Sequence, residues 1–68
     1  MMSQLEVYKI LKELGGEATT DEISELAKKK FPEYTLHMYV INRLKKLKKK
    51  GIVIKIDKNK WKIIDKFP

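Results

Sequence analysis

The stretch VINRLKKLKKKGIV, residues 40–53, contains the transition that decides the fold of this chain. Its apolar residues Val40, Leu44 and Leu47 recur at three- and four-residue spacing, which is typical of one buried face of an α-helix. A single glycine follows the last lysine and can end the helix, because it adopts a left-handed conformation without a Cβ clash. The next residues are β-branched, so the periodicity changes from helical to extended. The sequence therefore predicts a helix over about residues 35–50 that leads into a β-strand.

Two further helices are expected before this stretch. Apolar residues at helical spacing fill residues 3–14, and the pair Gly15-Gly16 then stops the first helix. Thr19 and Glu22 have the spacing of a capping box, in which each side chain accepts a hydrogen bond from the other residue's backbone N–H. The sequence therefore predicts a second helix over about residues 20–30, with a short extended segment between the two helices.

The last part of the chain is predicted to form a β-hairpin over about residues 52–64. Two β-branched runs flank residues 57–60, whose composition is typical of a turn. Within that turn, Asn59 is the residue best suited to a positive φ. The predicted order is therefore helix, short extended segment, helix, helix and hairpin, an α+β fold that forms a single domain over residues 1–68.

The length of the turn decides which hairpin residues face each other. An even-length turn centred on residues 58 and 59 predicts an apolar core face made of the pairs Ile56–Trp61 and Ile54–Ile63. The same register sets Lys55 opposite Lys62 on the exposed face, where like charges repel. A hairpin with such a pair is suited to lying along a phosphate backbone.

Composition excludes several classes of protein. Sixty-eight residues make one domain near the lower limit of size at which a chain can bury its own core. The chain has no cysteine, which excludes disulfides and thiolate metal sites. No apolar run approaches the roughly 18 residues of a membrane-spanning helix, so no membrane insertion is expected. The abundance of Lys, Glu and Ile suits a thermophilic source.

Charge is segregated along the chain. Residues 1–34 hold five lysines against seven carboxylates, a balance of −2, whereas residues 35–68 hold ten lysines and one arginine against two aspartates, a balance of +9. A surface that serves only solubility mixes its signs. The segregation therefore favours a polyanion-binding face in the second half over a general coat of lysines.

Two segments, ATTDEISELA at residues 18–27 and the stretch at residues 40–53, resemble the winged helix-turn-helix family, in particular its small archaeal or archaeal-virus members. The first is similar to the second helix of that family, and the other to its recognition helix running into the wing. The resemblance covers nearly the whole chain. It implies that the third helix enters the major groove of duplex DNA and that the hairpin touches the flanking backbone or minor groove. The topology and the +9 balance of the second half favour a small transcriptional regulator or a small chromosomal or viral DNA-binding protein.

At 3.6 residues per turn, the third helix has a polar and cationic side opposite its buried stripe. Asn42 can hydrogen-bond a base edge, Met38 can contact thymine methyl groups, and Tyr39 can donate to a phosphate. Lysines can contact phosphates or guanine acceptors. The expected DNA-binding residues are Thr35, Met38, Tyr39, Asn42, Lys45, Lys46 and Lys49 on this helix and Lys55, Lys58, Lys60 and Lys62 on the hairpin.

No catalytic or metal-binding pattern is present in the sequence. His37 is the only histidine, and there is no glycine-rich phosphate loop and no zinc-ligand spacing. The sequence therefore predicts a protein that is not an enzyme and uses no cofactor or metal. A cytoplasmic, nucleoid-associated location is expected for a DNA-binding protein of this kind.

The sequence is also compatible with partners other than duplex DNA. A winged helix can instead dock on a protein, as a module of a transcription, replication or membrane-remodelling assembly, and Met38, Tyr39 and Ile41 could form its apolar patch. Single-stranded or structured RNA is a weaker option, because the strands lack interleaved exposed aromatic residues. A homodimer is also open.

Overall fold

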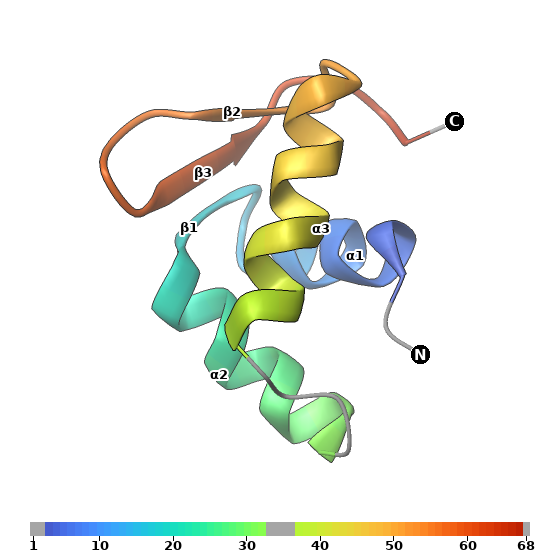
Figure 1. Ribbon diagram of the computed structural model, residues 1–68. Coiled ribbons are helices and arrows are strands. Elements are labelled where there is room, and N and C mark those ends of the chain that lie inside the picture. Colours follow the sequence, from blue (N-terminus) through green and yellow to red (C-terminus); the bar gives the residue numbers. More distant parts are fainter. Residues whose placement is uncertain (1–2, 33–36, 68) are drawn as a thin grey trace.

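The computed structural model describes residues 3–32 and 37–67, which form an α+β structure (Figure 1). The elements described are α1 (Gln4–Glu13), β1 (Glu17–Thr19), α2 (Thr20–Lys30), α3 (His37–Lys49), β2 (Val53–Lys55) and β3 (Lys60–Ile63). This order confirms the arrangement expected from the sequence, and the helix ends within the described residues agree with the expected ends to one residue. The expected start of the third helix at residue 35 lies outside the described residues.

Short polar side chains begin the first two helices. Ser3 Oγ accepts a hydrogen bond from the backbone N–H of Glu6 at 3.4 Å. At α2 both bonds of the expected capping box are present: Glu22 N donates to Thr19 Oγ1 at 3.1 Å, and Thr19 N donates to Glu22 Oε1 at 2.9 Å. These bonds satisfy N–H groups that have no partner inside the helix, and so they fix the start of α2 at Thr20.

Glycines follow the ends of α1 and α3. Gly15 and Gly16 have φ values of 93° and 86°, and Gly51 has a φ of 79°. This left-handed conformation carries little cost for a residue without a Cβ, so the glycines can reverse the chain there. Among the described residues, only glycines have a positive φ. The expectation of a positive φ at Asn59 is therefore wrong.

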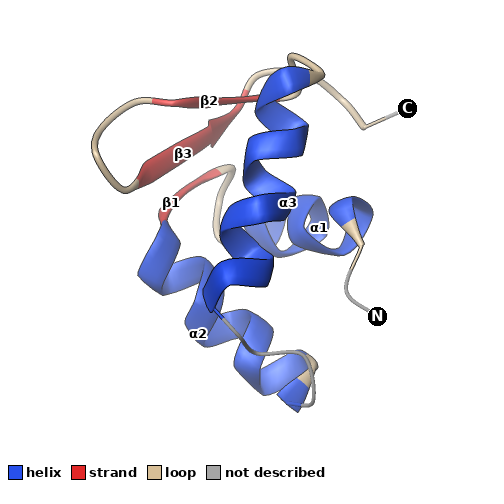
Figure 2. Cartoon of the chain, viewed as in Figure 1, coloured by secondary structure: helices blue, strands red, loops and turns tan. Residues whose placement is uncertain are grey.

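The strands β1, β2 and β3 form an antiparallel sheet with β3 in the centre (Figure 2). On one side of β3, Ala18 of β1 lies opposite Trp61. On the other side, Lys55 of β2 lies opposite the same tryptophan. The sheet therefore joins the segment that follows α1 to the C-terminal hairpin, so the hairpin is not an independent unit.

The hairpin register differs by one residue from the expected register. The observed pairs are Val53–Ile63, Ile54–Lys62 and Lys55–Trp61. Ile56 N donates to Lys60 O at 2.9 Å and closes a loop of three residues, 57–59, in place of an even-length turn. An odd loop shifts the pairing by one residue and exchanges the two faces of the strand. The expected pairs Ile56–Trp61, Ile54–Ile63 and Lys55–Lys62 are therefore wrong.

The shifted register changes which β2 residues enter the core. Val53 is fully buried, whereas Ile54 and Ile56 are 39% and 42% exposed, so the expectation that both isoleucines face the core is wrong. Residues 52–54 are all β-branched, and hydrophobicity alone is compatible with burial of either face. The loop length decides between them. Trp61 is 3% exposed, which confirms its expected core position.

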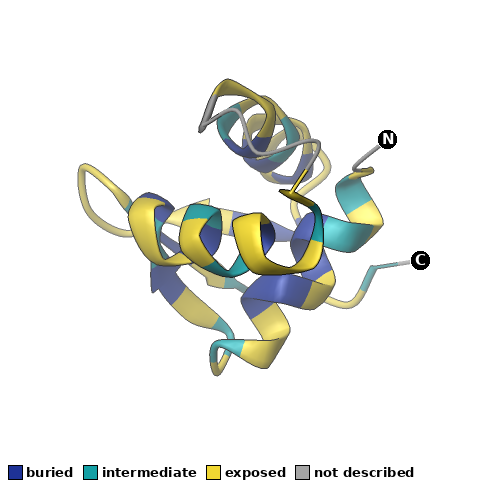
Figure 3. Ribbon diagram, turned by 90° about the horizontal axis from the view of Figure 1, so that it is seen from below, coloured by how far each residue is buried: buried dark blue, intermediate teal, exposed yellow. Residues whose placement is uncertain are grey.

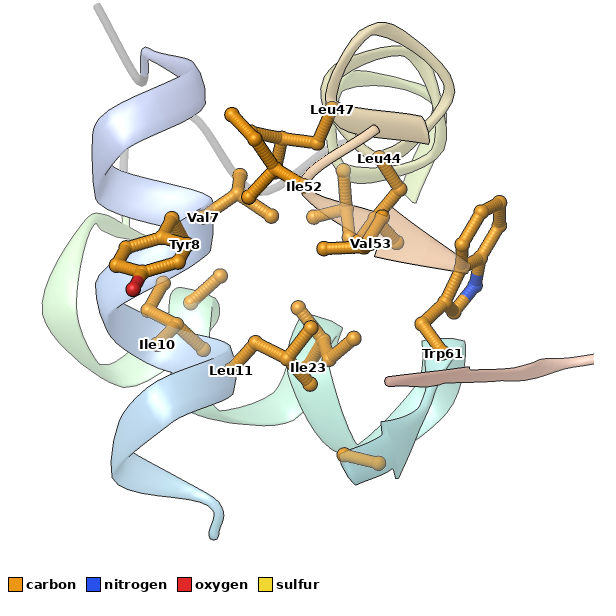
Figure 4. Close-up of a cluster of buried hydrophobic side chains, with 13 residues drawn as sticks. Val7, Tyr8, Ile10, Leu11, Ile23, Leu44, Leu47, Ile52, Val53 and Trp61 are labelled. Atoms are coloured by element: carbon orange, nitrogen blue, oxygen red, sulfur yellow. The ribbon is translucent and has the colours of Figure 1, made fainter. Parts of the chain in front are cut away.

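The core lies between the helices and one face of the sheet (Figure 4). α3 contributes Val40, Leu44 and Leu47, which confirms the described part of the buried stripe expected from the sequence. Figure 3 shows that buried residues follow the inner sides of the helices and exposed residues their outer sides. The full buried set is Val7, Tyr8, Ile10, Leu11, Ala18, Ile23, Ala27, Val40, Leu44, Leu47, Ile52, Val53 and Trp61.

Candidate nucleic-acid interface

α3 presents a polar and cationic surface on the side opposite its buried residues. This surface, called the α3 face below, consists of Met38, Tyr39, Asn42, Lys45, Lys46 and Lys49, all of them exposed. The helical layout correctly predicts that these six side chains point outward. Met38 is 61% exposed, the largest exposed fraction among the large apolar residues that the structure describes. Thr35, which was also expected on this surface, lies outside the described residues.

The lysines of the α3 face carry charge that nearby carboxylates do not neutralise. α3 contains no acidic residue. Within the part of the chain that the structure describes, ion pairs join Lys30 Nζ to Glu13 at 2.9 Å and Lys60 Nζ to Glu17 at 3.0 Å. Neither pair includes a lysine of α3. The α3 face therefore projects a concentrated positive potential, which attracts anionic partners.

Tyr39 and Arg43 meet at the border of the α3 face. They are one helical turn apart, and the guanidinium carbon of Arg43 lies 6.0 Å from the centroid of the Tyr39 ring. This distance is at the outer limit of a cation–π contact. Arg43 is half-buried. The contact adds a cation to the edge of the site, at a residue that the expected DNA-binding set did not include.

The four lysines expected to bind DNA on the hairpin have different environments. Lys55 Nζ lies 5.4 Å from the centroid of the Trp61 ring, in a cation–π contact on the core side of the sheet. Lys60 is half-buried and forms the ion pair with β1. Lys58 in the loop and Lys62 on the outer face of the sheet are exposed and take part in neither contact. Lys55 is exposed as well, but its ammonium group lies against the indole ring, so the exposed hairpin lysines without either contact are Lys58 and Lys62.

The N-terminus of α2 is occupied by acceptors from the protein itself. Free N–H groups at a helix N-terminus can bind phosphate, but here Thr20 N donates to Asn59 O at 2.7 Å and Glu22 N donates to Thr19 Oγ1. Hydrogen bonds from the backbone and side chain of Thr19 lower the pKa of the Glu22 carboxyl, and the charge of Lys60 adds to the effect. The resulting carboxylate repels phosphate, so α2 is less suited than α3 to an anion contact.

A buried hydrogen-bond network that the sequence analysis missed links α2 to the hairpin. Trp61 Nε1 donates to Thr20 Oγ1 at 2.9 Å, and Thr20 Oγ1 donates to Asn59 O at 3.1 Å. Thr20 and Trp61 are 41 residues apart in the sequence, so no local pattern indicates their contact. The one available signal was that a buried tryptophan N–H needs an acceptor.

The described residues hold no group of three or more His, Cys, Asp or Glu side chains that could bind a metal ion. A hollow of about 80 Å³ lies beside α1, with the Lys30–Glu13 ion pair in its wall. Sites for small organic ligands enclose about 300–1,000 Å³, so this hollow is too small for such a ligand. In the same part of the chain, no helix has the length and apolar character needed to cross a bilayer.

Comparison of the chain with protein-family models, with curated proteins and with solved structures finds no match. Its function is therefore inferred from its own surfaces.

Proposed function

We propose that this chain is a winged helix-turn-helix domain that binds duplex DNA, with α3 as the recognition helix and the β2–β3 hairpin as the wing. The order of the elements, with α2 directly before α3 and the hairpin directly after it, supports this fold. The antiparallel sheet of β1, β3 and β2 supports it as well. In such a domain the helix lies in the major groove and the wing touches the flanking backbone or minor groove.

The observation that carries the proposal is the composition of the α3 face. An α-helix fits the major groove of B-DNA, which is about 12 Å wide. Asn42 can make paired hydrogen bonds to adenine, and an exposed methionine can contact the methyl group of thymine. Lys45, Lys46 and Lys49 follow along the exposed side of the same helix, where they can meet phosphates. The face thus combines groups that read bases with groups that bind the backbone.

The biological role that fits this surface is that of a small transcriptional regulator at the nucleoid. Asn42, Met38 and Tyr39 are the only residues of the α3 face other than lysine, so sequence reading is expected to depend on them. A homodimer would extend the site to two half-sites about one helical turn of DNA apart. Selection of bound duplexes from a random pool tests this: an enriched motif indicates a regulator, and a palindrome indicates a dimer.

Fluorescence anisotropy with a labelled duplex tests the binding itself. If about five to eight phosphates are neutralised, the slope of log K against log salt is expected to lie near −5 to −7. The variant K45Q/K46Q/K49Q removes three of these contacts, so the slope should become about 3 units shallower and the affinity at low salt should fall about 100-fold. An unaltered affinity in this variant would overturn the proposal.

The matched control is K9Q/K12Q/K66Q, which removes the same number of charges from exposed positions on α1 and near the end of the chain. Lys12 lies in the last turn of α1, and Lys46 and Lys49 lie in the last turn of α3. Both variants therefore lose a favourable interaction of a lysine with a helix dipole. We expect the control to keep nearly the wild-type affinity. Equal losses in the two variants would indicate attraction by net charge alone.

Docking on a protein is the second candidate function, and the exposure of Met38 favours it. Tyr39 lies beside it with 38% of its surface exposed, and Ile41 is half-buried. A partner protein that covers this patch would need the apolar side chains more than the lysines. K45Q/K46Q/K49Q should then leave the interaction largely intact, whereas Met38→Lys should abolish it.

A further inference from the structure

Thr20 is the only polar residue that is buried among the described residues, with 6% of its surface exposed. It is the first residue of α2, and it meets the wing loop through both its backbone and its side chain. Its N–H donates to Asn59 O at 2.7 Å, and its hydroxyl donates to the same carbonyl at 3.1 Å. One carbonyl of the wing loop is thus held by two donors from a single residue of α2.

The third bond of the network reaches the centre of the sheet. Trp61 Nε1 donates to Thr20 Oγ1 at 2.9 Å, so the hydroxyl accepts from the core tryptophan and donates to the loop at the same time. Figure 4 shows Trp61 at the opposite end of the core cluster from Tyr8. A serine or threonine hydroxyl can accept one hydrogen bond and donate another at the same time. An aliphatic side chain at residue 20 would offer neither a donor nor an acceptor.

Because Asn59 lies in the wing loop, the hydrogen bonds to its carbonyl oxygen affect the position of that loop. Asn59 belongs to the three-residue loop 57–59, and its neighbour Lys58 is an exposed lysine of the wing. A loop this short has few internal hydrogen bonds: Lys58 N donates to Asp57 Oδ1 at 2.7 Å, and Lys60 N to Asp57 O at 3.4 Å. The contact with α2 therefore restricts where the loop can lie.

We propose that Thr20 is a positioning residue for DNA binding: its hydroxyl holds the wing loop against the start of α2, in the orientation from which Lys58 reaches the DNA backbone. This inference rests on the proposed function. Thr20 is buried and does not itself touch DNA. It acts through the loop carbonyl, and it couples the geometry of the wing to α2, the helix that precedes the recognition helix.

The test compares Thr20→Val, which removes the hydroxyl at nearly constant volume, with Thr20→Ser, which keeps it. In Thr20→Val the salt slope of duplex binding should become about 1 unit shallower, because the contact of Lys58 is lost, and the affinity near 0.1 M salt should fall about threefold. Thr20→Ser should keep the wild-type salt slope and the wild-type affinity. A wild-type slope and affinity in Thr20→Val would overturn the proposal.

A second measurement on the free protein separates this inference from the proposed function. Amide NMR shifts of residues 58–60 and the indole N–H resonance of Trp61, the only tryptophan, should move in Thr20→Val and return in Thr20→Ser. Unchanged loop amides would contradict the positioning role whatever the protein binds. If the wild type shows no duplex binding while the amides shift as expected, the positioning of the loop stands and the proposed function, with the role of Thr20 in DNA binding, fails.

A third variant keeps the proposal testable if Thr20→Val does not fold. Thr20→Val leaves the buried Trp61 N–H without an acceptor, and an unsatisfied buried donor destabilises a protein. The double variant T20V/W61F removes the donor and the acceptor together, so no unsatisfied N–H remains, although the smaller ring leaves space in the core. Circular dichroism checks that it is folded before its binding is measured. The double variant should show the same shallower salt slope. A wild-type slope in the folded double variant would overturn the proposal.

Discussion

The α3 face and the wing both carry lysines, but the two regions use them differently. On α3 the lysines stand on a helix without any carboxylate, and they are exposed. In the wing, Lys55 covers the ring of Trp61, and Lys60 pairs with Glu17 of β1. Within the described part of the chain, the lysines of the α3 face lack such contacts, whereas in the wing two of the four lysines have a partner within the protein.

This difference shows that the net charge of a segment does not measure its ability to bind a polyanion. A lysine that already has an internal partner offers a phosphate fewer free N–H groups and a partly compensated charge. By this criterion, we propose that the α3 face is the main binding surface and that the wing adds Lys58 and Lys62.

The largest effect is expected from the residues that define the hairpin register. Val53→Ala should lower the free energy of unfolding by about 2 kcal/mol, because Val53 is fully buried, whereas Ile54→Ala should lower it by only about 0.5 kcal/mol. Thermal unfolding followed by circular dichroism measures both. If Ile54→Ala proves the more damaging change, the register is the even-turn register, and Lys55 then faces Lys62 as an exposed pair.

A smaller effect is expected from the wing lysines, where the pair Lys58 and Lys62 is compared with the pair Lys55 and Lys60. K58Q/K62Q should weaken duplex binding about tenfold and make the salt slope about 2 units shallower, with little change in stability. K55Q/K60Q should weaken binding less, and it should lower the free energy of unfolding by about 0.5–1 kcal/mol because it removes the cation–π contact and the ion pair. Equal losses of affinity would show that internal contacts do not withhold Lys55 and Lys60 from DNA.

The smallest effect concerns the start of α2, on which the wing loop rests. The folded protein has a lowered pKa at Glu22, below the ordinary value of 4.5, because Thr19 donates hydrogen bonds to the carboxylate. The stabilisation from this shift is fully present above pH 4.5 and is lost as the pH falls through the lowered pKa.

Glu22→Gln is the control for that effect, since glutamine keeps a capping acceptor but does not titrate. The stability advantage of the wild type over Glu22→Gln should shrink as the pH falls below 4.5 in thermal melts. A constant difference between the two proteins across this range would contradict the assigned cause.

The same two regions show how much could be predicted from the sequence. α3 could be predicted residue by residue, because its apolar residues recur over 13 positions and only one rotation of the helix buries Val40, Leu44 and Leu47 together. Its exposed face follows directly from that rotation.

The hairpin register could not be predicted in the same way. Val53 and Ile54 are both β-branched, so the choice of buried face depended on the loop length, which the sequence of the turn left open. The contacts of Lys55 with Trp61 and of Lys60 with Glu17 depend on that register and on the pairing with β1. Long-range partners were missed for a similar reason: Phe67 packs on Tyr8 with ring centroids 5.7 Å apart, and no local pattern links residues so far apart.

The central claim is that the α3 face is the surface that contacts DNA, and an amide NMR titration of the protein with a short duplex tests it most directly. We expect the largest shifts at Asn42, Lys45 and Lys49, smaller shifts at Lys58 and Lys62, and none on the exposed side of α1. Shifts concentrated on α1, or no shifts in low salt, would contradict it.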